Sequence, residues 1–88
     1  MKIAVFDTYV TTRSGALMHF DVLVPLGSSQ LAENFAWQWL ATIGLTRDAI
    51  ELQSCQYCHS ETPQPDTLQT IRRQGFAILP LEGCPVPD

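Results

Sequence analysis

Two runs of β-branched and aromatic residues near the N-terminus, separated by a short loop with a glycine, constrain the fold most. Residues 2–10 and 17–24 each favour a strand, because branched and aromatic side chains suit a pleated sheet. Gly15 lies between them, and glycine readily adopts the positive φ that a hairpin loop needs. The sequence therefore predicts an N-terminal β-hairpin.

The alternation along this hairpin assigns side chains to its two faces. We place Val10 opposite Leu17, which leaves Thr8 opposite His19 and turns Asp7 toward the apolar face. A bulge, or hydrogen bonds to backbone amides, would have to accommodate that carboxylate. In this register a nearly continuous apolar surface contains Ile3, Val5, Tyr9, Met18, Val22 and Val24. We expect this surface to meet the helices.

A helix is predicted after the hairpin. Apolar residues recur at helical spacing over 29–43, and Gly44 follows where a left-handed C-cap belongs. Ser28 or Ser29 can accept a backbone N–H at its start. Trp37 projects away from the apolar stripe, so we expect it to be the more exposed tryptophan and a candidate for a partner contact.

The C-terminal half predicts two further strands and a second helix. Residues 49–54 alternate as a short strand, whereas the prolines and polar residues of 55–65 indicate a loop. A shorter helix then ends at Gly75. Residues 76–81 form the last strand, and Pro80 indicates an edge position or the strand's end.

Together these elements predict an α+β fold in the order ββαβαβ. It has two layers, with the helices packed on one face of a mainly antiparallel sheet. Residues 1–84 are expected to form a single domain, because a chain of 88 residues has room for one core. Residues 85–88 are expected to be a frayed tail.

Charge and hydropathy exclude several classes of function. Nine acidic residues against five basic ones leave a formal net charge of −4, and the basic residues are scattered, so no strip could follow a phosphate backbone. No apolar run approaches the roughly 20 residues that cross a bilayer. Asp7 and Arg13 interrupt the segment in which an export signal would lie. We therefore expect a cytoplasmic protein that binds neither nucleic acid nor membranes.

The densest group of reactive side chains is the C-x-x-C-H pattern of Cys55, Cys58 and His59, followed later by Cys84. The cysteines Cys55, Cys58 and Cys84 could hold a structural zinc ion, with a histidine as the fourth ligand. Two alternatives stay open: a dithiol redox site, which needs a cysteine at a helix N-terminus, and covalent haem attachment, which needs export. In the simplest interpretation the thiols are reduced, bind no cofactor and pack as small hydrophobic groups.

His19 and Asp21 form a second group, because residues two apart on a strand share a face. An acid and an imidazole, with the hydroxyl of Thr8 opposite, are the residue types of a hydrolytic site. No nucleophile elbow or oxyanion motif accompanies them, and a hydrogen-bonded strand face is the simpler interpretation. We therefore assign no catalytic residue and keep Asp7, His19 and Asp21 as secondary candidates.

Several of these segments together resemble one protein family. In chain order they are FDTYV at 6–10, MHFDV at 18–22, the pair Phe35 and Trp39, CxxCHS at 55–60 and EGC at 82–84. In this order the chain resembles the small bacterial domain-of-unknown-function family DUF2024. The resemblance covers nearly the whole chain and implies a small α+β domain, without an activity, substrate or cofactor that could be carried over.

The sequence leaves three classes of function open. We expect an acidic, cytosolic binding or regulatory module that presents the cysteine segment and Trp37 to a protein partner or to a second copy of itself. The first alternative is a structural zinc domain, in which the metal stabilises a core of limited size. The second is a small enzyme that uses a thiol or the pair of His19 and Asp21, although no spacing specifies a reaction.

Overall fold

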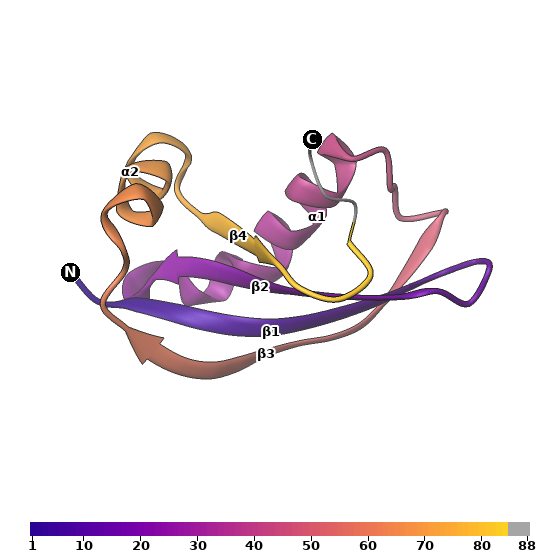
Figure 1. The fold of residues 1–88 in the computed structure, drawn as a ribbon, viewed down its shortest axis with the longest axis horizontal. Coiled ribbons are helices and arrows are strands. Elements are labelled where there is room, and N and C mark those ends of the chain that lie inside the picture. Colours follow the sequence, from indigo (N-terminus) through magenta and orange to yellow (C-terminus); the bar gives the residue numbers. More distant parts are fainter. Residues whose placement is uncertain (85–88) are drawn as a thin grey trace.

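A four-stranded antiparallel sheet forms the centre of the computed structural model, which describes residues 1–84 (Figure 1). The hairpin consists of β1 (Ile3–Thr12) and β2 (Leu17–Pro25). Beside β1 lies β3 (Ile50–Glu61), and beside β2 lies β4 (Ala77–Pro80), so the strand order is β3-β1-β2-β4. The predicted α+β class and the ββαβαβ order are confirmed, and β4 is an edge strand as Pro80 indicated. The frayed tail predicted for 85–88 lies outside the described residues.

Two α-helices connect the strands. After β2 the chain first forms a 3-10 helix, η1 (Leu26–Leu31), and then α1 (Ala32–Thr42); the predicted serine cap at 28–29 does not form, and Ser29 Oγ instead donates to the backbone oxygen of Leu26. The second helix, α2 (Pro65–Gln74), ends at Gly75 in the left-handed conformation. Neither helix of the described chain has the length and apolar character that spanning a membrane requires.

The main core lies between α1 and one face of the sheet. Ala32, Ala36 and Leu40 of α1 are buried against alternate residues of the hairpin. Those hairpin residues are Ala4, Val10, Met18, Phe20, Val22 and Val24. Thr8 points into the same face and is fully buried; its hydroxyl hydrogen-bonds the backbone oxygen of Phe6. This core fixes the register of β1 against β2.

The register differs by one residue from the one expected from the sequence. Val10 pairs with Met18 rather than Leu17, so Tyr9 lies opposite His19 and Asp7 lies opposite Asp21. Asp7 therefore points away from the main core and needs no bulge. The observed register buries Thr8 in place of Asp7. A buried hydroxyl can donate a hydrogen bond to a neighbouring backbone oxygen, whereas a carboxylate has no proton to donate, so burying Thr8 costs less free energy.

A smaller apolar cluster lies on the other face of the sheet. Ile3, Val5 and Leu23 alternate with the core residues along their strands and pack with Ile71 of α2 and with Ala77. The helix α2 thus lies against the face opposite α1, near the start of β1, whereas the sequence placed both helices on one face. Beyond this cluster the second face carries Asp7, Tyr9, His19 and Asp21.

The third strand is longer than predicted. The segment 55–61, expected to be a loop, continues β3 as an edge strand along β1. Its register shifts twice, between Val5 and Phe6 and between Tyr9 and Val10 of the partner strand. Its polar composition fits an edge strand of which one side faces solvent, and the prolines lie beyond its end, at Pro63 and Pro65.

Candidate metal centre

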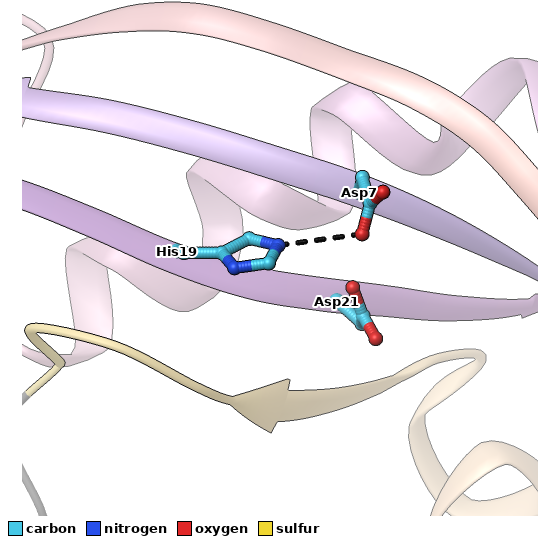
Figure 2. A group of neighbouring side chains, drawn as sticks. All are labelled: Asp7, His19 and Asp21. Carbon is cyan, nitrogen blue, oxygen red and sulfur yellow. Dashed lines mark hydrogen bonds and ion pairs between the residues drawn. The ribbon is translucent and has the colours of Figure 1, made fainter.

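Asp7, His19 and Asp21 meet on the face of the sheet away from α1 (Figure 2). Their strand neighbours Thr8 and Phe20 are buried in the main core, so alternation turns these three side chains to the opposite face. Asp7 comes from β1, and the other two residues come from β2. One ligand atom from each residue lies within 4.8 Å of the others, and in the described chain no other group of three His, Cys, Asp or Glu side chains is this close.

The His19 imidazole is held in place on both sides. Its Nε2 lies 3.3 Å from Oδ1 of Asp7, and its ring stacks on Tyr9 at a centroid distance of 4.1 Å and an interplanar angle of 7°. The side chain of His19 is 17% exposed, whereas that of Asp7 is 43% exposed. The imidazole is therefore oriented before any ligand binds, and the carboxylate of Asp7 stays accessible.

The two carboxyl groups strongly affect each other's pKa. Burial raises the pKa of Asp21 to about 6, and the adjacent Asp7 carboxylate adds to this effect. Interaction with the Asp21 carboxyl group and with His19 lowers the pKa of Asp7. Oδ1 of Asp21 is buried and has no hydrogen-bond partner among the described residues. Like charges directly opposite each other on paired strands are destabilising, so the pair favours either a shared proton or a bound cation.

The segment after β4 fixes the backbone of His19. The N–H of His19 donates to the backbone oxygen of Glu82 at 2.8 Å, and the N–H of Leu81 donates to the oxygen of His19 at 2.9 Å. The thiol of Cys84 also lies 3.4 Å from that oxygen. Gly83 makes this approach possible, because a Cβ there would come within 2.1 Å of the oxygen of Leu17. The EGC segment therefore positions the histidine.

A β-bulge in β3 places a thiol beside Asp7. Tyr57 pairs with Phe6 and His59 pairs with Val5, which leaves Cys58 as the extra residue between them. Cys58 is exposed, and its thiol is among the groups that lower the pKa of Asp7. Partial loss of solvation, followed by the negative charges of Asp7 and Asp21, raises the pKa of Cys58.

His59 and Glu61 extend this group along β3. Nδ1 of His59 lies 3.3 Å from Cys58 Sγ, and Nε2 lies 2.7 Å from Oε1 of Glu61. If the Nε2–H of His59 donates to Glu61, Nδ1 is left with a lone pair directed at the thiol. Glu61 was not among the candidates from the sequence, although its position two residues after His59 on one strand could have indicated it.

The structure does not gather the three cysteines. Cys55 lies on the core face of β3, where its sulfur is 3.5 Å from the Thr8 hydroxyl, whereas the Cys58 sulfur lies against His59 on the second face. Cys84 follows β4 and contacts the backbone of β2, and β1 separates β2 from β3. The predicted zinc set of Cys55, Cys58 and Cys84 is therefore wrong in its geometry, because Cys55 and Cys58 point to different faces and Cys84 lies at the far edge of β2.

Trp37 is less accessible to a protein partner than the sequence indicated. It is half-buried, packs against the main core, and lies under the guanidinium group of Arg47, whose carbon is 4.5 Å from the ring centroid. Trp39 is also half-buried, so the structure does not bear out the expected difference in exposure between the two tryptophans. A protein partner at Trp37, or self-association, stays a prediction.

Fold and site together define the class of the protein: a small antiparallel α+β domain with an Asp–His–Asp group on the partly open face of its sheet. The family model of the domain of unknown function DUF2024 matches residues 1–81, and the chain belongs to this family. A Nitrosomonas europaea protein, a structural genomics target with an NMR structure, is 38% identical to it. That match covers 97% of this chain and 100% of the other, with a TM-score of 0.80. The comparison with curated proteins found no match.

Proposed function

We propose that this domain is a binding module for a divalent transition-metal ion, held by Asp7, His19 and Asp21. The observation that carries the proposal is the convergence of two carboxylates and one imidazole, with ligand atoms within 4.8 Å of one another. The buried, unpartnered Oδ1 of Asp21 supports it, because a cation would satisfy that oxygen and offset the repulsion between the two carboxylates.

The spacing of the donor atoms suits a metal ion. Bonds of about 2.0–2.2 Å from an ion to nitrogen or oxygen place neighbouring ligand atoms roughly 3 Å apart. Nε2 of His19 and Oδ1 of Asp7 are 3.3 Å apart, so an ion can take the place of the proton between them with little movement. Imidazole and carboxylate together suit zinc, iron, nickel or manganese, whereas carboxylates and carbonyls alone suit calcium and magnesium.

Stacking on Tyr9 and the contacts of the EGC segment add preorganisation. A metal ligand binds more tightly when its orientation is fixed by neighbouring groups, and the His19 ring and backbone are both fixed here. Three protein ligands leave further coordination positions for water or another group. The proposed compartment is the cytosol, where thiols such as Cys58 stay reduced.

Calorimetric titration of untagged, chelator-treated protein with Zn²⁺ and with Mn²⁺ tests this proposal. We expect binding of one ion per chain, weakened at least tenfold by His19→Ala and by Asp21→Asn. Glu51→Gln is the matched control, because Glu51 is an exposed carboxylate that pairs with Thr11 on the same sheet, near the hairpin loop. Absence of binding, or equal affinity in His19→Ala and the unchanged protein, would contradict the proposal.

A further inference from the structure

Cys58 is the one cysteine that the fold directs to the Asp–His–Asp group. In a regular strand, Cys55 and Cys58 would lie three positions apart and so on opposite faces. Cys55 faces the main core, whereas His59 pairs with Val5, whose side chain lies on the second face. Sγ of Cys58 is 3.3 Å from Nδ1 of His59, so the bulged residue directs its thiol to that second face, which also carries Asp7 and His19. The influence of Cys58 on the pKa of Asp7 agrees with this placement.

The thiol also has an oriented imidazole beside it. Nδ1 of His59 is 3.3 Å from Cys58 Sγ, while Glu61 holds the other ring nitrogen at 2.7 Å. A thiol that binds a metal ion must lose its proton. At this exposed position the S–H bond can break as the sulfur–metal bond forms, and the proton leaves to solvent. His59 thus orients the sulfur and is not itself a ligand.

We propose that Cys58 supplies a thiolate ligand to the ion held by Asp7, His19 and Asp21, so that the site takes a borderline ion such as Zn²⁺ or Co²⁺ in preference to Mg²⁺ or Ca²⁺. This inference rests on the proposed function. A zinc ion lies about 2.3 Å from a thiolate sulfur and about 2.0–2.2 Å from a carboxylate oxygen. The exposed side chain of Cys58 shares the face of the Asp–His–Asp group, and rotation about its own side-chain bonds would bring the sulfur to the ion.

Cys55 provides the matched control. It lies on the same strand as Cys58 but faces the main core beside Thr8. Cys55→Ser removes one thiol and leaves the proposed ligand set intact. Cys58→Ser removes an exposed sulfur atom, so the fold should tolerate it.

Titration of the reduced protein with Co²⁺ under anaerobic conditions, followed by absorption spectroscopy, tests the proposal. Bound cobalt gives visible d–d bands, and a thiolate ligand adds a charge-transfer band in the near ultraviolet. We expect both in the unchanged protein and in Cys55→Ser. In Cys58→Ser we expect the d–d bands alone, with affinity for Co²⁺ at least tenfold weaker. Excess Zn²⁺ should remove the charge-transfer band, and excess Mg²⁺ should not.

The outcomes separate this inference from the proposed function. Visible d–d bands without a charge-transfer band in the unchanged protein, or a charge-transfer band that survives Cys58→Ser, would overturn the role of Cys58 and leave the metal site standing. Absence of every cobalt band from the unchanged protein would overturn both.

Discussion

The Asp21 carboxyl group destabilises the folded state of the metal-free protein. It is partly buried, lies directly opposite Asp7, and has one oxygen without a partner among the described residues. Its pKa is raised to about 6 from an ordinary value of 3.8, so the folded state binds a proton more tightly than the unfolded chain does. The free energy of unfolding should therefore fall as pH rises from about 4 through about 6. The lowered pKa of Asp7 acts only below 3.8, where stability is lost as pH falls.

In metal-free protein, Asp21→Asn should remove the fall in the free energy of unfolding between about pH 4 and pH 6. An amide cannot ionise, and it can donate a hydrogen bond to Asp7, so we expect the variant to melt at a higher temperature than the unchanged protein above about pH 6. Below about pH 4, where the native carboxyl group is protonated, the two proteins should differ little. Thermal unfolding across this pH range, with chelator present, provides the measurement. Parallel pH profiles for the two proteins would show that Asp21 is not the cause.

The same residues show how far the sequence predicts the site. The spacing of His19 and Asp21 predicts that they share a face, and the two side chains do meet. The sequence wrongly turns Asp7 to the apolar face. Both faces of the first half of β1 are apolar, through Ile3, Ala4, Val5 and Phe6, so alternation there cannot choose a register. A shift of one residue in the pairing of β1 with β2 turns each side chain of β1 to the opposite face. The burial of Thr8 distinguishes the two registers, and the pattern of apolar residues does not predict that a threonine is buried.

At the scale of elements, the turn after β4, residues 81–84, holds the β2 backbone in position at His19. It docks on His19 through the backbone of Leu81 and Glu82, and Gly83 makes the close approach with φ at 73°. Gly83→Ala should destabilise the protein and should also weaken metal binding, although residue 83 is not a ligand. The added Cβ would meet the backbone oxygen of Leu17, which cannot move without shifting the strand.

Gly44→Ala is the control for this prediction. Gly44 also has a positive φ, of 81°, but nothing lies within 4 Å of the position of its Cβ. It should therefore cost roughly 1–2 kcal/mol of stability through backbone strain alone and leave metal affinity unchanged. Chemical denaturation and zinc titration of both variants give the comparison. Equal effects of the two substitutions on zinc affinity would rule out a positioning role for the turn.

Aromatic contacts hold the helix α1 against β2 and against the residue that precedes β4. Phe35 stacks on Phe76 with a centroid distance of 4.6 Å, and Trp39 packs on the fully buried Phe20 at 4.7 Å. Phe35→Ala and Trp39→Ala should each cost about 3 kcal/mol or slightly more, the lower part of the range for such truncations, because both rings are half-buried. Trp37→Ala should cost less, since one face of Trp37 is covered by the exposed Arg47. Urea unfolding measures all three, and equal losses at 37 and 39 would contradict the ranking.

The third strand shows why the functional segment was the part least well predicted. Residues 55–61 carry polar and reactive side chains that are typical of a loop, yet pairing with β1 holds them in an edge strand. Pairing of this kind is a tertiary contact, which local composition does not contain. The bulge at Cys58 depends on it, and so the placement of Cys58 on the same face as Asp7 could not be derived from spacing along the chain.

Across the whole molecule, one face of the sheet forms the main core and the other carries the candidate metal site. The face under α1 contains the main apolar cluster, whereas the other face has a small cluster under α2 and then the Asp–His–Asp group (Figures 1 and 2). A domain of this size buries a modest fraction of its surface, so two carboxylates in mutual repulsion are a notable loss of stability. A bound cation reverses the sign of that contribution, and metal binding should therefore be visible in the stability of the entire chain.

Zinc should raise the melting temperature of the protein by an amount set by its affinity. An ion that binds only the folded state, at a free concentration of 100 times Kd, adds about 2.7 kcal/mol to the free energy of unfolding. For a domain of this length each kcal/mol shifts the melting temperature by about 4–8 °C, so we expect an increase of roughly 10–20 °C. Differential scanning calorimetry with and without Zn²⁺ makes the measurement.

Three variants serve as controls for the increase in melting temperature. His19→Ala should abolish it, and Glu51→Gln should retain it. Asp21→Asn should already melt at a high temperature without zinc and should gain little from zinc. An equal increase in His19→Ala would place the zinc elsewhere on the molecule and remove the Asp–His–Asp group as its site.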